Sequence, residues 1–347
     1  MNVQAIVLPY YGIGDFLSNL TFINALLKKF PKDKFLIFTK DRTKAKELLS
    51  CENNIKIIYI KNRYNLISSF FNLFSFSRII IKNKVSKIWI FHRSPRYALI
   101  SYISGIRDIY GYGFGIQRFF LRNCKELNKK FKKSIPVEKG YFFLKNNNVS
   151  LKPLNPFLKI EKKKIKIIKN NFKKYPKKWI LIGFSSTDLS RTWRKEYFVE
   201  LINKLDSRSK YSFFLIGAPQ EIKLANEIKK LIKIKKGKIV NFCKPIEETM
   251  ALMSLSKIYI GNDSGTAHLS LACKLKTYII HGGSPPYNKT VYNKNYPAIF
   301  LKNLNPIIPP DGKIRNPNLK TSESVTQEEG MDLIRPEYFL RKISKLN

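Results

Sequence analysis

Short apolar runs alternate with amphipathic stretches along the first half of the chain. Four runs have the length and residue types of buried strands: 5–8, 35–38, 55–60 and 88–91. Helical patterns lie at 16–29, 66–81 and 99–104, and the Gly-rich stretch 108–115 is interpreted as a strand end and a loop. Strands that alternate with helices are typical of a parallel sheet covered by helices on both faces.

The second half repeats this pattern after a break. Residues 146–156 (NNNVSLKPLNP) are polar and contain two prolines, so we interpret them as a linker. Strand runs follow at 179–183, 211–216, 238–241, 258–260 and 277–281, with helical patterns from 161–174 to 266–273 between them. The chain is loop-rich after 287, most clearly at 303–317, and a last helix is expected at 336–346. The 347 residues suit two doubly wound α/β domains, which we place at 1–150 and 151–330, with a terminal helix within 331–347.

The charge balance is extreme, with 65 Lys and Arg against 24 Asp and Glu, a formal charge of +41. A polyanionic partner is one explanation. Compositional drift is the other, because Lys, Asn, Ile, Phe and Tyr are all abundant. The lysines are spread along the whole chain without a basic recognition helix or zinc-finger spacing, so specific recognition of nucleic acid is not expected.

The cysteines and the apolar segments indicate the cellular compartment in which we expect the chain. The four cysteines are far apart and form no CxxC pair, which argues against a zinc site or a disulfide framework and fits a reducing cytoplasm. No signal peptide or membrane-spanning run is expected. The helix at 66–81 is rich in Phe but interrupted by Ser, Asn and Arg78. It is either a core-facing helix or one that lies on a membrane.

The stretch 258–272 (IYIGNDSGTAHLSLA) carries the strongest chemical signal. A strand runs into Asp263-Ser264-Gly265 and directly on into a helix, with His268 in its first turn. The free amides and partial positive charge of such a helix start suit a phosphate or diphosphate. Asp263 or Ser264 could cap the helix, and Gly265 allows close approach of a ligand. The alternative is an ordinary capped helix with a core histidine.

Three segments in one order resemble the heptosyltransferase family of glycosyltransferases, the ADP-heptose-using enzymes of lipopolysaccharide core assembly. They are the Gly12-Ile-Gly-Asp15 turn, the segment from Ser185-Ser186 to Arg191-Thr-Trp, and Asp263-Ser-Gly-x-x-His268-Leu. The resemblance implies a GT-B architecture of two Rossmann-like domains that face each other across a cleft. It places the acceptor on the first domain and the nucleotide-sugar donor on the second, packs the last helix back on the first domain, and needs no metal or other cofactor.

The resemblance also implies residue roles. Asp15 would be the general base that takes the proton of the acceptor hydroxyl; the alternative is a helix cap. Gly12 and Gly14 would keep this loop low beneath the acceptor. The donor diphosphate would be held by the segment Asp263, Ser264, Gly265, Thr266, Ala267 and His268, with the amides of Thr266 and Ala267 pointing at it.

The remaining candidate binding residues are arginines and serines, and most of them have a second, purely structural interpretation. Arg191 stands where the family has a Lys, which keeps the charge and adds a second donor. Ser185 and Ser186 either bind the same phosphates or merely turn the chain. Arg93 and Arg96 are candidates for an anionic acceptor, with plain surface charge as the alternative.

We therefore expect an inverting glycosyltransferase that moves a sugar, heptose by resemblance, from a nucleoside diphosphate to an anionic, lipid-linked saccharide. We expect it in the cytoplasm of a bacterium, peripheral to the anionic surface of the inner membrane. Alternatives are a relative that uses another nucleotide sugar, a non-catalytic nucleotide-sugar binder and a basic nucleic-acid-binding protein. A dehydrogenase is disfavoured because Gly-Ile-Gly-Asp-Phe-Leu-Ser (12–18) lacks the third glycine of GxGxxG.

Overall fold

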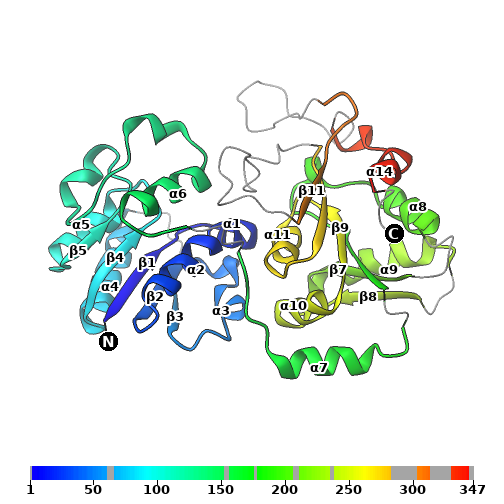
Figure 1. Ribbon diagram of the computed structural model, residues 1–347, viewed down its shortest axis with the longest axis horizontal. Helices are drawn as coiled ribbons and strands as arrows, with labels where there is room; N and C mark the ends of the chain where they lie inside the picture. Colours follow the sequence, from blue (N-terminus) through cyan, green and yellow to red (C-terminus); the bar gives the residue numbers. More distant parts are fainter. Residues whose placement is uncertain are drawn as a thin grey trace. The chain divides into compact units, whose positions relative to one another are not determined.

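The computed structural model describes residues 2–60, 66–151, 156–175, 178–205, 211–234, 238–282, 303–312 and 330–343. The chain divides into two compact units with a boundary between Pro156 and Phe157 (Figure 1). The break falls at the end of the predicted linker, six residues after the predicted boundary at 150. Each unit is a parallel sheet with helices on its faces.

Unit 1 holds a five-stranded parallel sheet in the order β3-β2-β1-β4-β5. Its strands are β1 (Val3–Val7), β2 (Lys34–Thr39), β3 (Ile55–Tyr59), β4 (Val85–Ile90) and β5 (Asp108–Tyr110). Its α-helices are α1 (Ile13–Ser18), α2 (Leu20–Lys29), α3 (Ala45–Leu48), α4 (Leu66–Lys82), α5 (Arg96–Ile103) and α6 (Pro136–Asn146). The chain runs outward from β1 to β3 and then returns to β4 on the other side of β1. The order of connection therefore reverses between β1 and β4.

Aromatic residues fill the core of unit 1. Phe38 of β2 lies 4.5 Å from Phe76 of α4. On the sheet, Trp89 stacks on Tyr110 at 4.2 Å, and its indole N–H donates to Gln4 at 2.8 Å. Ile80 of α4 is also fully buried. One side of α4 is thus a core face, as one of the two interpretations of this helix expected.

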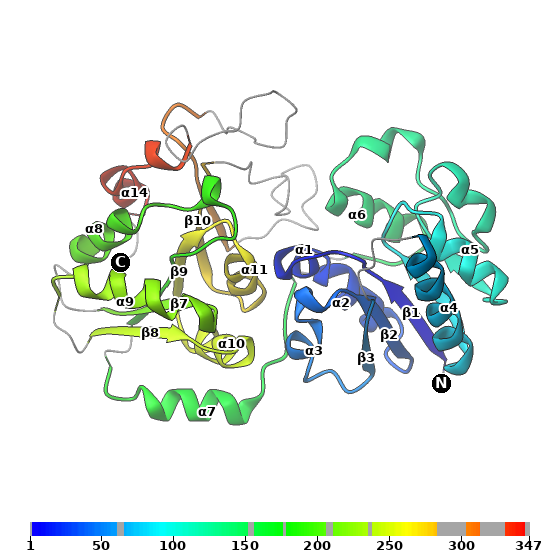
Figure 2. The same ribbon diagram turned by 180° about the vertical axis from the view of Figure 1, so that it is seen from behind.

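Unit 2 holds a six-stranded parallel sheet in the order β11-β10-β9-β6-β7-β8. Its strands are β6 (Lys178–Gly183), β7 (Tyr211–Gly217), β8 (Ile239–Cys243), β9 (Ile258–Asn262), β10 (Lys276–Ile280) and β11 (Leu304–Ile307). Its α-helices are α7 (Lys162–Asn171), α8 (Lys195–Leu205), α9 (Ile222–Leu231), α10 (Ile246–Leu255), α11 (Gly265–Ala272) and α14 (Pro336–Lys342). Here the order of connection reverses between β6 and β9. Figure 2 shows this unit from behind, with α10 and α11 near β9.

Strand β11 corrects the prediction of loop at 303–317. It pairs in parallel with β10, from Thr277 opposite Leu304 to Ile280 opposite Ile307. The strand contains Pro306, which donates no ladder hydrogen bond. It is tolerated because β11 is at the edge of the sheet.

The last helix packs into the core of unit 2. Phe339 of α14 is fully buried in the core of unit 2, 5.8 Å from the ring of Trp193 and 6.3 Å from that of Tyr278. The Trp193 indole N–H donates to the carbonyl of Ile334 at 2.7 Å. The aromatic side of this helix therefore completes the core of unit 2, and its implied packing on the first domain stays a prediction.

Candidate functional site

In each unit the candidate residues lie where the order of strand connection reverses. Ligands of open parallel sheets bind beyond the carboxyl ends of the strands at this point. In unit 2 the relevant loops follow β6 and β9. These two loops and the start of α11 contain all of the predicted donor residues: Ser185, Ser186, Arg191, Asp263, Ser264, Gly265, Thr266, Ala267 and His268.

The N-terminus of α11 presents uncapped amides. Ser264 occupies the cap position with extended backbone, but its side chain makes no capping hydrogen bond. Side-chain capping by Ser264 was therefore a wrong prediction. Gly265 and Thr266 are partly exposed and, as the first two helical residues, have no acceptor within the helix for their N–H groups. The Ala267 amide, by contrast, donates to the Ser264 carbonyl at 3.1 Å, which leaves Gly265 and Thr266 as the better-placed donors.

A buried tyrosine organises this helix start. The Tyr259 hydroxyl lies 2.7 Å from Thr266 Oγ1, which lies 2.9 Å from Ser264 Oγ. Burial raises the pKa of Tyr259 to about 12, so the hydroxyl remains protonated at neutral pH. The hydroxyl fits because Gly183 and Gly261, paired across β6 and β9, have no side chains. A Cβ on Gly183 would lie 1.8 Å from the Tyr259 oxygen.

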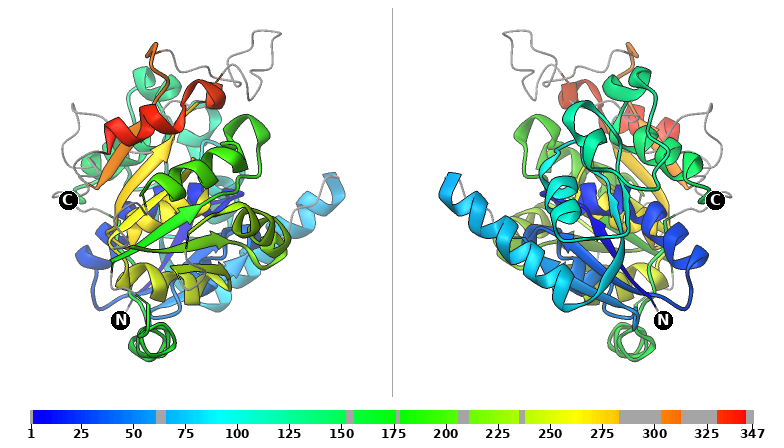
Figure 3. Two further views of the ribbon diagram at one scale, coloured as in Figure 1. Left: turned by 90° about the vertical axis from the view of Figure 1, so that its right-hand side faces the viewer. Right: turned by 90° about the vertical axis from the view of Figure 1, so that its left-hand side faces the viewer.

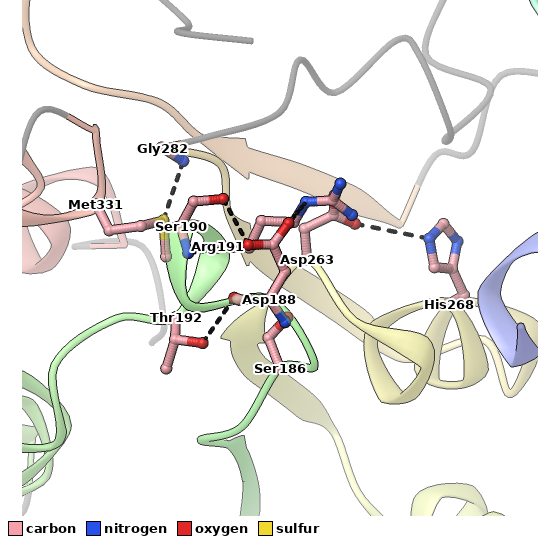
Figure 4. A network of polar contacts seen from close by, with 9 residues as sticks. All are labelled: Ser186, Asp188, Ser190, Arg191, Thr192, Asp263, His268, Gly282 and Met331. Carbon is pink, nitrogen blue, oxygen red and sulfur yellow. Dashed lines mark hydrogen bonds and ion pairs between the residues drawn. The ribbon is translucent and has the colours of Figure 1, made fainter. Parts of the chain in front are cut away.

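His268 faces a carboxylate. Its Nε2 lies 3.7 Å from Asp263 Oδ1, and both side chains are almost fully buried (Figure 4). The two residues come from the first turn of α11 and the end of β9. Asp263 is therefore a polar neighbour of the imidazole, so His268 is not packed among apolar side chains alone.

Arg191 is held by its own loop. Asp188 Oδ1 accepts from the Ser190 amide at 3.0 Å and from its hydroxyl at 2.7 Å, and Asp188 Oδ2 lies 3.3 Å from Arg191 Nε (Figure 4). The Ser186 hydroxyl accepts from the Asp188 amide at 3.4 Å, which supports its role in turning the chain. Ser185 is partly exposed at the same edge. Asp188, which the sequence did not single out, thus restrains a mostly buried guanidinium.

Asn262 joins the two loops and was also missed. Its side chain is fully buried, accepts from the Trp193 amide at 3.0 Å and donates to the Phe184 carbonyl at 3.1 Å. One amide group therefore connects the end of β9, the end of β6 and the start of α8. An Asn at the end of an apolar strand was visible in the sequence, but its partners depend on which strands are neighbours.

Asp15 lies at the corresponding place in unit 1. It is exposed in the first turn of α1, while Gly12 takes the cap position. The structure therefore rules out the alternative in which Asp15 is the helix cap. A Cβ on Gly12 would lie 3.6 Å from Asp15 Oδ2, and the Gly14 carbonyl accepts from the Ser18 hydroxyl at 2.8 Å.

Arg93 and Arg96 belong to a group of basic residues that we call the basic cluster: Lys40, His92, Arg93, Arg96 and Lys139. Lys40 follows β2, the next three follow β4, and Lys139 is on α6. Burial lowers the pKa of His92, and Arg96 and Arg93 lower it further. Burial likewise lowers the pKa of Lys139, with Arg93 adding to the effect. Arg93 and Arg96 are themselves exposed, and their positive charges act on His92 and Lys139 nearby.

Lys40 is the most enclosed member, with 8% of its surface exposed. Its ammonium lies 5.8 Å from the centre of the Tyr11 ring. Burial lowers the pKa of Lys40; Asp41 opposes this effect and Arg96 adds to it. Within the described ranges, no group of three or more His, Cys, Asp or Glu side chains is placed to hold a metal ion.

Comparison with known proteins identifies relatives. Residues 93–308 match the model of glycosyltransferase family 9 (heptosyltransferase). Lipooligosaccharide heptosyltransferase 2 of Campylobacter jejuni is 25% identical over 288 residues, which cover 78% of this chain and 75% of the relative.

Solved structures show the same fold. ADP-heptose lps heptosyltransferase II of E. coli superposes with a TM-score of 0.72 at 16% identity, over 100% of this chain and 98% of the other. E. coli heptosyltransferase WaaC with ADP-2-deoxy-2-fluoro heptose gives a TM-score of 0.66 at 15% identity, over 99% and 100%. The chain therefore has the GT-B fold, and the predicted α/β class is confirmed.

Proposed function

Because this chain belongs to glycosyltransferase family 9, and is thus a glycosyltransferase, we propose that it transfers heptose from ADP-heptose to an anionic, lipid-linked saccharide of the lipopolysaccharide core. The acceptor oxygen attacks the anomeric carbon as the bond from that carbon to the diphosphate breaks. The acceptor proton passes to a carboxylate, ADP leaves, and the configuration inverts.

The donor part of the proposal is supported most directly by the start of α11. A departing diphosphate gains negative charge, and fixed N–H groups stabilise that charge without reorganisation. The Gly265 and Thr266 amides and the restrained Arg191 guanidinium are donors of this kind on adjacent loops of unit 2. A homologous fold binds an ADP-heptose analogue in WaaC, which favours ADP as the nucleotide.

The acceptor part of the proposal is supported by unit 1. Asp15 is an exposed carboxylate at the reversal of strand connection, where it can accept a hydroxyl proton. The basic cluster lies at the ends of the neighbouring strands and suits an acceptor that carries phosphate or carboxylate groups. We place the enzyme in the cytoplasm, at the anionic inner surface of a bacterial membrane, with an attachment that high salt weakens.

Replacement of Asp15 by Asn tests the base. We expect kcat for transfer from ADP-heptose to fall about 10²–10⁴-fold while the affinity for ADP stays within about twofold. Asp33→Asn is the matched control, because Asp33 precedes β2 and so lies at the opposite, amino edge of the same sheet. An Asp15→Asn enzyme that retains the parent kcat would remove Asp15 from the mechanism.

The donor is tested separately by thermal stabilisation with ADP, UDP, GDP and CMP, with NAD and a short DNA duplex as controls. We expect ADP to stabilise the protein most. A preference for another nucleotide would preserve the reaction type and change the sugar donor. A response to DNA alone would refute the nucleotide-sugar assignment.

A further inference from the structure

Unit 1 exposes large apolar side chains on three neighbouring elements: α4, α5 and the 3₁₀ helix Gly115–Phe120 (η2). We define the α4–η2 face by six of these residues: Phe74, Ile81, Tyr102, Ile103, Ile116 and Phe119. The exposed fraction is 62% for Phe74, 67% for Ile103 and 68% for Phe119. Single exposed apolar residues are ordinary, but several on adjoining elements indicate an interaction surface.

The three elements lie side by side (Figure 3, right). The hydroxyls of Ser77 on α4 and Ser104 at the end of α5 are 2.7 Å apart. The ring of Tyr102 on α5 lies 6.1 Å from that of Phe120 on η2. The helix α4 has Phe76 turned into the core, while Phe74 is exposed on another side. The membrane-facing interpretation of this helix therefore concerns its outer side, and its inner side still builds the core.

The charge of this part of the chain is far from the average. Residues 53–125 contain 13 Lys and Arg but a single acidic residue, Asp108, whereas an even spread of the 24 acidic residues would place about five there. That one carboxylate lies 3.7 Å from the ammonium of Lys87. With 13 basic residues and one acidic residue, the segment carries a net charge of +12. This positive charge favours an anionic partner for the surface.

In two places on this surface an arginine lies beside an aromatic ring, so positive charge and apolar surface occur together. The Arg122 guanidinium lies 4.1 Å from the centre of the Tyr102 ring, and that of Arg118 lies 5.3 Å from the Phe119 ring. An aromatic ring beside a guanidinium suits the boundary of a bilayer, where the ring reaches the acyl chains and the cation meets lipid phosphate.

We propose that the α4–η2 face docks the enzyme on an anionic phospholipid bilayer by inserting its apolar side chains between basic contacts to the headgroups. The inference rests on the proposed function in one respect, the lipid-linked acceptor. Nucleic acid would use the charge but gain little from exposed Ile and Phe. If a second copy of the chain bound here, two positively charged surfaces would face each other and repel.

The test is flotation of the full chain with vesicles of phosphatidylcholine, with and without phosphatidylglycerol, at low and high salt. The face variant is Ile116→Ser/Phe119→Ser. The matched control is Ile222→Ser/Leu231→Ser, which removes two exposed apolar residues from α9 of unit 2. A cooperative thermal unfolding transition at the Tm of the parent verifies that every variant is folded.

We expect the parent to bind vesicles that contain phosphatidylglycerol and to ignore pure phosphatidylcholine. The face variant should bind about tenfold or more weakly, because its apolar contribution is lost, and the control should stay within about twofold. The proposal is overturned if the parent ignores anionic vesicles at low salt, or if the face variant binds as the parent does. It is also overturned if the face variant dissociates a dimer present without lipid, or loses DNA binding alone.

Turnover separates this proposal from the proposed function. The vesicles contain no acceptor, so their binding does not depend on the reaction. With an acceptor freed of its acyl chains, the face variant should retain the parent kcat. Loss of vesicle binding with intact turnover supports the docking face, whereas failure of the Asp15→Asn test refutes the proposed mechanism and leaves the vesicle result unchanged.

Discussion

Replacement of Asn262 by Ala should separate the two donor-side loops of unit 2. The change removes a 3.0 Å hydrogen bond from the Trp193 amide and a 3.1 Å hydrogen bond to the Phe184 carbonyl, at a residue with no exposed surface. Each backbone group left buried without a partner costs about 1–3 kcal/mol, so the loss is about 2–6 kcal/mol. At about 2–4 °C for each kcal/mol in a domain of this size, Tm should fall by roughly 4–24 °C.

The assay is thermal unfolding with and without ADP, together with ADP affinity measured calorimetrically well below Tm. We expect affinity to fall about tenfold, because the Arg191 loop and the start of α11 lose their common support. The control is Asn241→Ala on β8 of the same sheet, which removes one exposed hydrogen bond to Asn226 and should change Tm by about 1 °C or less. An Asn262→Ala protein with the parent Tm would refute the reasoning. A lowered Tm with unchanged ADP affinity would show that Asn262 stabilises the fold without positioning the loops.

Four further changes test other parts of the structure. Arg191→Ala should weaken ADP about tenfold but leave adenosine unchanged, with Arg191→Lys close to the parent and Lys195→Ala, an exposed cation on α8, as calorimetric control. Tyr259→Phe should cost about 1 kcal/mol in a urea titration and weaken ADP a few-fold; unchanged ADP binding would exclude the hydroxyl from shaping the site. Phe339→Ala should cost about 3–5 kcal/mol in the same titration, and a loss below about 1 kcal/mol would contradict its place in the core. Burial and the neighbouring arginines hold the pKa of His92 below its ordinary 6.5. The unfolded chain therefore binds a proton there first, and stability should fall as pH drops below about 6.5. His92→Gln should flatten that slope in urea titrations at several pH values, and an unaltered slope would show that His92 is not its source.

The sequence predicted those features that depend on chain order alone. The segment 263–268 directly follows an apolar strand run, and Asp15 lies in the turn after another, so their position at a carboxyl edge needs no knowledge of the sheet. The order of the strands is different, because an apolar run does not reveal its neighbours. The contact between β6 and β9 gives Asn262 its two partners and makes Gly183 and Gly261 necessary for Tyr259. These residues were missed for that reason.

The errors in the fold have a similar origin. The sequence predicted a last helix at 336–346, but the pattern of a helix shows which side is buried and not what covers it. In the structure, Phe339 packs against Trp193 and Tyr278 of unit 2. Strand β11 was missed because Asn305 and Pro306 lie in its middle. An edge strand tolerates both, whereas a central strand would not tolerate the proline.

The basic cluster of unit 1 gives the strongest argument that part of the positive charge is functional. Lysines gained by drift would remain at the surface, where water screens them and flexible side chains move apart. Lys40 is instead 92% covered, and burial together with Arg96 lowers its pKa. In the folded state, Lys40 and Arg96 are therefore close enough at the carboxyl ends of the strands for their positive charges to repel each other. A bound anion would relieve that repulsion, so phosphate should raise Tm more in the parent than in Lys40→Met, which keeps the apolar stem and removes the charge. Equal stabilisation of the two proteins by phosphate would show that the cluster binds no anion.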